Sequence, residues 1–194
     1  MLHLSTVEST TLELLKKLQQ LPVLCNTRLV GGTALALQLG HRKSVDLDFF
    51  GQINVDSQDL KEALRTLGTL TILNDSKNIH IYVLNEVKID IVNYTYPWLD
   101  DVVYKDGIRL ASPRDIAAMK ITAIEGRGTK KDFVDIYFLL KKYSLKNLLD
   151  FYSQKYPDSS SFMAMKSLAE EEPMPYMFVD VSWDEIKKSI LSRL

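Results

Sequence analysis

The sequence predicts an α+β fold in which an α/β sheet core is followed by a helical C-terminal half. In the first half, short apolar runs bounded by turn residues alternate with helical patterns. Beyond Pro97 the apolar residues recur at helical spacing. A length of 194 residues suits one domain. We therefore expect residues 1–110 to form the sheet core and residues 111–194 to form a helical region packed on it as a single compact unit.

Composition and charge exclude several classes of protein. Lys and Arg number 24 against 25 Asp and Glu, and the net charge of −1 argues against a non-specific nucleic-acid coat. Cys25 is the single cysteine, which excludes an intramolecular disulfide and a cysteine zinc cluster and indicates a reducing cytoplasm. The sequence has neither a membrane-length apolar run nor a signal-peptide pattern, so we expect a cytoplasmic protein with no membrane partner.

Helical and extended patterns alternate through the first half. Leu12, Leu15 and Leu18 fall at helical spacing and predict an amphipathic helix. Asn85-Glu86 separates two apolar runs and is typical of a hairpin turn. The expected elements are helices over residues 6–20, 33–39 and 57–67 and strands over residues 28–30, 45–50, 70–73, 79–84 and 87–92.

The second half begins with a strong helix-start signal. Ser112 suits the N-cap, Pro113 the first helical position and Asp115 the first turn. We expect this helix to end near Gly126. The helices expected in this half cover residues 113–125, 130–142, 145–155, 159–171 and 182–193.

The most informative feature is a pair of carboxylates after a glycine turn. Asp46 and Asp48 are two residues apart on an expected strand, so both side chains emerge on the same face. Two acids on one strand face repel each other and are costly to desolvate, and a divalent cation bridging them removes both problems. Paired hard oxygen ligands suit Mg²⁺ or Mn²⁺. The alternative is a solvent-facing pair at a sheet edge.

Gly31-Gly32 lies where a strand meets a helix, a position at which backbone N–H groups favour a phosphate. A phosphate cradle beside paired carboxylates suits nucleotidyl transfer with metal ions. Asp90, embedded in a β-branched run, fits as a third carboxylate from a neighbouring strand. The alternatives are an ordinary turn at the glycines and, for Asp90, a polar-outward position shared with Lys88.

These motifs together resemble the AbiEii/AbiGii toxin family. The resemblance lies in Leu29-Val-Gly-Gly-Thr-Ala-Leu-Ala-Leu and in His41-Arg-Lys-Ser-Val-Asp-Leu-Asp-Phe-Phe50, and two later segments, residues 109–120 and 131–137, are also similar to family motifs. It covers about residues 28 to 140 and places the chain in the nucleotidyltransferase superfamily that includes DNA polymerase β.

The resemblance implies a mixed sheet with flanking helices, a triphosphate held at Gly31, Gly32 and Thr33, and metal held by Asp46 and Asp48. The implied activity moves a nucleoside monophosphate from an NTP to an acceptor hydroxyl and releases pyrophosphate. Members commonly act as toxins of toxin–antitoxin or phage-defence systems, and some modify tRNA 3′ ends. We therefore expect an NTP, an RNA acceptor and a cognate antitoxin as partners.

Further candidate residues are charged side chains that suit a site for a triphosphate. Lys120 lies on or beside the buried stripe of its helix, where it either extends to water or meets an anion, and the resemblance favours a phosphate. Helix capping is a sufficient explanation of Asp132 but not of Asp135, so Asp135 is the favoured functional acid and Asp132 the second candidate. The functional acid either holds Lys120 or accepts a proton from the acceptor hydroxyl.

Two groups of loop residues complete the set. Arg42 and Ser44 precede the strand acids and suit phosphate binding, with a solvated loop as the alternative for Arg42. Arg127, Lys130 and Lys131 form a small basic group that suits RNA or a triphosphate, or simply a solvated face.

We expect a Mg²⁺-dependent nucleotidyltransferase whose catalytic residues are Asp46, Asp48, Lys120 and Asp135, with Asp90 as a further metal ligand. One alternative is the same transfer to a protein or to a small molecule such as an aminoglycoside. The other is a non-catalytic module that binds an NTP.

Overall fold

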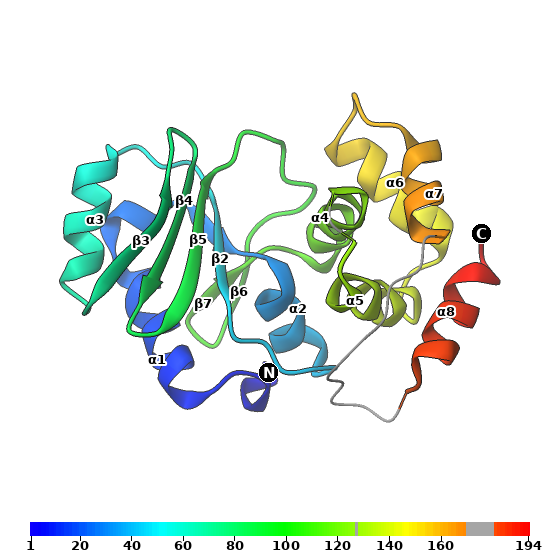
Figure 1. The fold of residues 1–194 in the computed structure, drawn as a ribbon, viewed down its shortest axis with the longest axis horizontal. Helices are drawn as coiled ribbons and strands as arrows, with labels where there is room; N and C mark the ends of the chain where they lie inside the picture. Colours follow the sequence, from blue (N-terminus) through cyan, green and yellow to red (C-terminus); the bar gives the residue numbers. More distant parts are fainter. Residues whose placement is uncertain (127, 170–180) are drawn as a thin grey trace. The chain divides into compact units, whose positions relative to one another are not determined.

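The structure, a computed structural model, describes residues 1–126, 128–169 and 181–194 and forms two compact units (Figure 1). The sheet unit comprises residues 1–95 and 102–111. The helical unit comprises residues 96–101 and 112–194. None of the helices that the structure describes combines the length and apolar character needed to cross a bilayer.

The sheet unit contains a seven-stranded mixed sheet in the order β3-β4-β5-β2-β1-β7-β6. β2 is parallel to β5, β1 is parallel to β7, and the other neighbouring pairs are antiparallel. The expected α+β class and the mixed sheet that the family resemblance implied are therefore confirmed. The strands are β1 (Thr27–Leu29), β2 (Leu47–Gly51), β3 (Leu70–Asp75), β4 (Ile79–Leu84), β5 (Val87–Asn93), β6 (Val103–Lys105) and β7 (Ile108–Leu110).

Helices flank both faces of this sheet. Figure 1 shows α1 (Ser9–Gln20) and α3 (Ser57–Arg65) on one side and α2 (Gly31–Leu39) on the other. The Asp56 carboxylate begins α3 by accepting hydrogen bonds from the N–H groups of Gln58 and Asp59. Gly40 ends α2 in the left-handed region, at φ 70°. Two 3₁₀ turns, Leu4–Thr6 and Pro22–Leu24, flank α1.

Two tight hairpins close strand pairs in the sheet. The expected turn at Asn85-Glu86 joins β4 to β5, and both of its residues have positive φ, 49° and 67°. A second hairpin, β6–β7, was not expected from the sequence. Its turn residues Asp106 and Gly107 also have positive φ, 52° and 76°. Asp-Gly is a typical hairpin signal, but each flanking strand has three residues, too few to show an alternating pattern.

The helical unit begins as the sequence predicts. Ser112 Oγ accepts a hydrogen bond from the N–H of Asp115 at 3.1 Å and donates one to Asp115 Oδ2 at 2.9 Å. The expected helix over 159–171 is present to residue 169, and its remaining residues lie outside the described part of the chain. The helices are α4 (Pro113–Gly126), α5 (Lys130–Leu140), α6 (Leu145–Lys155), α7 (Ser161–Ala169) and α8 (Trp183–Leu191).

A buried ion pair ties residues 96–101 to the helices of this unit. Lys155 and Asp115 have 0% exposed side chains, and Lys155 Nζ lies 2.7 Å from Asp115 Oδ1. The same ammonium donates to the Pro97 carbonyl at 2.8 Å and lies 4.4 Å from the centre of the Trp98 ring. Asp115 Oδ1 also accepts from the N–H of Leu99 at 2.9 Å. This one pair thus holds the segment in place.

Replacing Lys155 with Met should destabilise the helical unit by about 3 to 4 kcal/mol, because the Asp115 carboxylate would remain buried without its cation. Urea unfolding followed by circular dichroism measures the change in the free energy of unfolding. Lys146→Met is the matched control, since Lys146 pairs with Asp150 on the exposed surface of the same helix. Equal effects of the two substitutions would contradict a stabilising role for the buried pair.

Asp75 connects α3 to the β3–β4 hairpin. Ser57 and Lys61 of α3 bond Asp75 Oδ2 at 2.5 and 2.9 Å, and Tyr82 and His80 of β4 bond Asp75 Oδ1 at 3.0 and 2.6 Å. The hydrogen bond from Ser57 lowers the pKa of Asp75 well below its usual range, with His80, Lys61 and Tyr82 adding to the effect. Burial raises the pKa of Tyr82 to about 12.

Acid should remove the stabilisation that Asp75 supplies. A carboxyl with a depressed folded-state pKa stabilises the fold above its unfolded-state pKa, and this contribution is lost as pH falls through the folded value. Asp75→Asn should therefore cost about 1 kcal/mol at pH 6, and the difference from the wild type should narrow steadily below about pH 4. Urea unfolding at several pH values measures it. A constant difference across the acid range would contradict this account.

Candidate functional site

The Asp48 carboxylate lies directly over the first glycine of α2. A Cβ built on Gly31 would come within 2.2 Å of Asp48 Oδ2, so any side chain at this position would collide with the carboxylate. Gly31 also has a φ of +66°, which L residues rarely adopt. The N–H of Val30 donates to the Asp48 carbonyl at 2.9 Å. The glycine therefore permits a carboxylate at the positive end of a helix, where negative charge is stabilised.

The Arg42 guanidinium lies over Gly32, the second glycine, as the Asp48 carboxylate lies over the first. A Cβ on Gly32 would lie 2.2 Å from Arg42 Nη2 and 3.3 Å from Ser44 Oγ. Arg42 is 7% exposed, which excludes the solvated-loop alternative. The space above the Gly-Gly turn is thus filled by an anion and a cation of the chain itself. The turn brings Arg42 and Ser44 together with Asp48, as expected of one site.

Thr33 fixes the segment that leads to the first carboxylate. Its side chain is fully buried, and its hydroxyl is within hydrogen-bond distance of Ser44 Oγ, at 2.8 Å, and of the Asp46 carbonyl. Asp46 itself lies one residue before β2, because the strand begins at Leu47 rather than at the expected residue 45. Thr33 therefore contacts the backbone of Asp46, and its hydroxyl is directed into the protein.

Asp90 lies beside Asp48 on the neighbouring strand. The two residues are opposite each other in the parallel β2–β5 register, so their side chains share a face of the sheet. Lys88 Nζ holds both oxygens of Asp90, at 2.6 and 2.7 Å. This pairing is the structural alternative that the sequence left open. Ligation of a metal by Asp90 would require Lys88 to release it.

The donor set on this face fits a divalent cation that also binds a substrate phosphate. Among the described residues, no group of three or more His, Cys, Asp or Glu side chains is arranged to hold a metal ion. Mg²⁺ commonly takes only one or two protein carboxylates and completes its shell with water and substrate phosphates. The Asp48 carboxylate over Gly31 meets that smaller requirement, and Asp46 precedes it on the other side of Leu47.

A second group of charged residues is buried within the helical unit. Lys120 of α4 lies 2.7 Å from Asp132 Oδ1 and 2.7 Å from Asp135 Oδ2, both on α5. The exposed fractions of the three side chains are 7%, 1% and 0%, so Lys120 meets anions and does not extend to water. Thr129 Oγ1 donates to Asp132 Oδ2 at 2.6 Å.

This cluster corrects the interpretation of Asp132. Its carboxylate was expected to act through helix capping, but it forms the same ion pair to Lys120 as Asp135 does. The two acids are three residues apart on α5, a spacing that places both side chains on the same face of the helix, toward Lys120 of α4. Lys130 is also buried, beneath the ring of Trp183, and only Lys131 of the expected basic group is exposed. Arg127 lies outside the described residues.

Solved structures with the same architecture are nucleotidyltransferases. The toxin MenT4 of Mycobacterium tuberculosis aligns with a TM-score of 0.55 and 14% identity, over 96% of this chain and 84% of its own. ANT(2″)-Ia in complex with adenylyl-2″-tobramycin aligns with a TM-score of 0.59 and 12% identity, over 75% of this chain and 96% of its own. The fold is therefore that of the nucleotidyltransferases.

Sequence comparison narrows this class to one family. Residues 13–191 match the family described as "Nucleotidyl transferase AbiEii toxin, Type IV TA system". The chain belongs to this family, as its glycine and aspartate motifs predict, and is a nucleotidyltransferase. An uncharacterized protein of Aquifex aeolicus (strain VF5) is 34% identical over 185 residues, which cover 91% of this chain and 90% of the relative.

Proposed function

We propose that this nucleotidyltransferase moves a nucleoside monophosphate from an NTP to a hydroxyl group of RNA, at a tRNA 3′ end, as a toxin controlled by a cognate antitoxin. The observation that carries the proposal is the Asp48 carboxylate over Gly31 at the start of α2, with Arg42 against Gly32. Asp46 precedes Asp48 by two residues in the sequence. A carboxylate pair next to a buried guanidinium suits a triphosphate that arrives with a divalent cation.

Asp46 and Asp48 are the residues that we assign to Mg²⁺ or Mn²⁺. When bound there, the cation would neutralise the charge of the triphosphate and stabilise the entering and leaving oxygens. Thr33 holds the Asp46 backbone, and Ser44 connects Thr33 to the segment of Arg42. The backbone of Asp46 is thereby held in position before any ligand arrives, which reduces the entropy lost on binding.

Arg42 is the residue that we assign to the phosphates. Its guanidinium is always charged and presents several N–H donors in one plane, which matches phosphate oxygens. The acceptor hydroxyl attacks the α-phosphorus, and the bond from that phosphorus to pyrophosphate breaks. The proton of the attacking hydroxyl passes to solvent water. Such a transfer needs positioning and charge neutralisation more than a covalent intermediate.

In the helical unit, we assign Lys120 and Asp135 to the reaction as a pair, with Asp132 as a second acid on the same cation. Two carboxylates against one ammonium fix the position and the charge of Lys120. The three groups together carry one net negative charge, so Lys120 would have to leave one of the two carboxylates in order to neutralise phosphate charge.

The proposal is tested by incubating the purified protein with Mg²⁺ and each α-³²P-labelled NTP, in the presence of total RNA and cell lysate. Label in a tRNA-sized band, dependent on the divalent cation, is the expected result. Omitting Mg²⁺ or adding a chelator is the matched control for the metal.

Two other outcomes would replace the proposed acceptor or the proposed activity. Label on a protein band, or on an aminoglycoside added to the reaction, would show a different acceptor. The fold shared with ANT(2″)-Ia makes the aminoglycoside a necessary arm of the experiment. Retained NTP binding with no label on any acceptor would indicate a binding module.

A further inference from the structure

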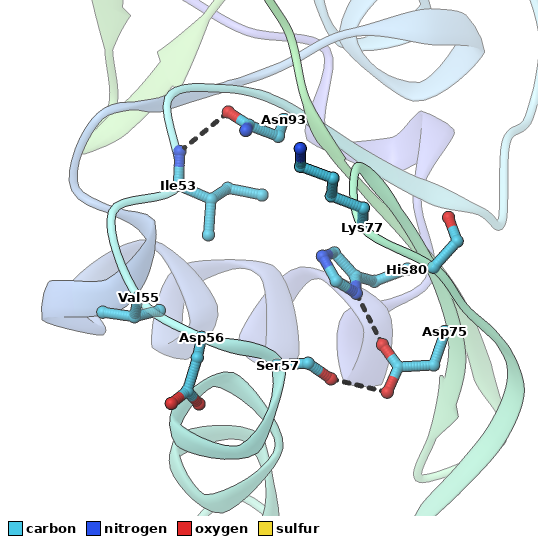
Figure 2. A pocket seen from close by; sticks show the side chains of 9 residues that line it. Ile53, Val55, Asp56, Ser57, Asp75, Lys77, His80 and Asn93 are labelled. Carbon is cyan, nitrogen blue, oxygen red and sulfur yellow. Dashed lines mark hydrogen bonds and ion pairs between the residues drawn. The ribbon is translucent and has the colours of Figure 1, made fainter.

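A cavity of about 360 Å³ lies in the sheet unit, away from the carboxylate site. It is bounded by the loop after β2, the start of α3, the β3–β4 turn and the end of β5 (Figure 2). His80 lies opposite Ile91 in the β4–β5 register, whereas the adjacent Asp90 points to the other face. The cavity therefore opens on the face opposite Asp48 and Asp90. Its lining residues are Ile53, Val55, Asp56, Ser57, Asp75, Ser76, Lys77, His80 and Asn93.

His80 presents one ring nitrogen to this cavity. The residue is 5% exposed, and its Nδ1 lies 2.6 Å from Asp75 Oδ1. Because Nδ1 faces a carboxylate, that nitrogen carries a hydrogen, and in the neutral ring Nε2 is a hydrogen-bond acceptor. Figure 2 shows the ring with its other nitrogen directed into the cavity. Asp75 is itself held by Ser57, Lys61 and Tyr82, so the ring orientation is fixed.

Two nitrogen donors point to the same space. Asn93 Oδ1 accepts a hydrogen bond from the N–H of Ile53 at 3.3 Å, which leaves Asn93 Nδ2 for the cavity. The Lys77 side chain extends across the cavity toward Asn93 (Figure 2). Within the described residues, no hydrogen bond or ion pair uses Lys77 Nζ, His80 Nε2 or Asn93 Nδ2. Two N–H donors and one imidazole nitrogen in the same cavity are thus available to a ligand.

We propose that this cavity binds a phosphate group through Lys77, His80 and Asn93. The Lys77 ammonium and the Asn93 amide N–H are donors to a phosphate oxygen, and a bond from a charged donor is one of the strong ones. His80 Nε2 accepts a hydrogen bond from a phosphate hydroxyl. The Asp56 carboxylate is directed away from the cavity in Figure 2, where it accepts two backbone N–H groups of α3. Asp75 is balanced by Lys61 and His80. Neither acid opposes the anion directly.

The size of the cavity indicates a ligand larger than the inorganic ion. Pockets of about 300 Å³ and above suit small organic molecules. Ile53 and Val55 provide an apolar wall on which a sugar or base can lie. The shared chemistry is a phosphate group, and inorganic phosphate and a mononucleotide such as AMP are the two sources to be compared.

The charged groups that face His80 are Asp75 on β3, Lys61 on α3 and Lys77 in the turn. Sulfate, a tetrahedral anion like phosphate, is a further probe of the same site.

The test is histidine-selective NMR of the intact protein without divalent cations, during titration with inorganic phosphate, AMP or sulfate. The chain has three histidines, so the His80 signals can be identified by their loss in His80→Asn. This variant keeps an amide N–H for Asp75 but lacks Nε2. Lys77→Met removes the ammonium from an exposed turn, where a folding defect is not expected. Lys105→Met, an exposed lysine at the other hairpin, is the matched control.

Saturable movement of the His80 signals, with affinity reduced about tenfold or more in Lys77→Met and unchanged in Lys105→Met, is expected. Tighter binding of AMP than of phosphate would identify a nucleotide as the ligand, and equal binding would identify the free ion. The proposal is overturned if the His80 signals do not respond to millimolar phosphate or AMP. It is also overturned if Lys77→Met binds as the wild type does, which would place the anion elsewhere, at the NTP site for example.

Discussion

Replacing Asp48 with Asn should reduce nucleotidyl transfer by about a hundredfold to a thousandfold. Asparagine has nearly the same shape, so the packing over Gly31 is preserved. The substitution removes one of the two carboxylates that we assign as ligands of the divalent cation. The rate of transfer of labelled NMP, measured at saturating NTP and over a range of Mg²⁺ concentrations, gives the effect. Asp46→Asn should behave in the same way.

The matched control for this change is Asp101→Asn, because Asp101 is an exposed aspartate outside the proposed site. It should retain wild-type activity. Unfolding of both variants in urea tests whether Asp48→Asn remains folded at the assay temperature. If the folded Asp48→Asn protein kept more than about a tenth of the wild-type rate, Asp48 could not be a required metal ligand.

Lys120→Met should lower the free energy of unfolding of the helical unit by about 5 kcal/mol, at the upper end of the range for a broken buried ion pair. The reason is that both Asp132 and Asp135, 1% and 0% exposed, would lose the cation that each contacts at 2.7 Å. Urea unfolding followed by circular dichroism measures the loss. Lys131→Met, at an exposed position of α5, serves as the control and should change stability little.

A double substitution separates the charge of this cluster from its packing. Lys120→Met combined with Asp135→Asn removes one negative charge together with the positive one. We expect it to be more stable than Lys120→Met alone, because one buried carboxylate fewer is left without a cation. Strictly additive losses in the two single variants and the double variant would show that the pair is not energetically coupled.

The fold was largely predictable because its elements carry strong local signals. The Ser112–Asp115 helix start and the Asn85-Glu86 turn depend on neighbouring residues only, and both appear where expected. The β6–β7 hairpin was missed because its strands are short and gain their stability from pairing. β7 pairs in parallel with β1, which is about eighty residues away in the sequence. A pairing between such distant segments cannot be predicted from the local sequence pattern.

The residue types of the candidate site were also predictable, whereas their contacts were not. The sequence identifies Asp46 and Asp48 because two acids on one strand are unusual. It does not reveal that Gly31 and Gly32 accommodate Asp48 and Arg42 of the same chain, because these contacts arise only when α2 packs beside β2. For the same reason, helix capping is a sufficient explanation of Asp132 in the sequence alone. The ion pair between Asp132 and Lys120 forms only when α4 packs against α5.

The division of the chain into two interleaved units has a consequence for synthesis on the ribosome. The polypeptide leaves the sheet unit at residue 95, returns at residue 102 and leaves again after residue 111. A nascent chain that ends at residue 95 therefore lacks β7, and β1 presents an unpaired edge. The sheet is complete only when residue 110 has emerged. Premature termination before that point should yield an aggregation-prone product without a complete nucleotidyltransferase core, so a partly translated chain should have no enzyme activity.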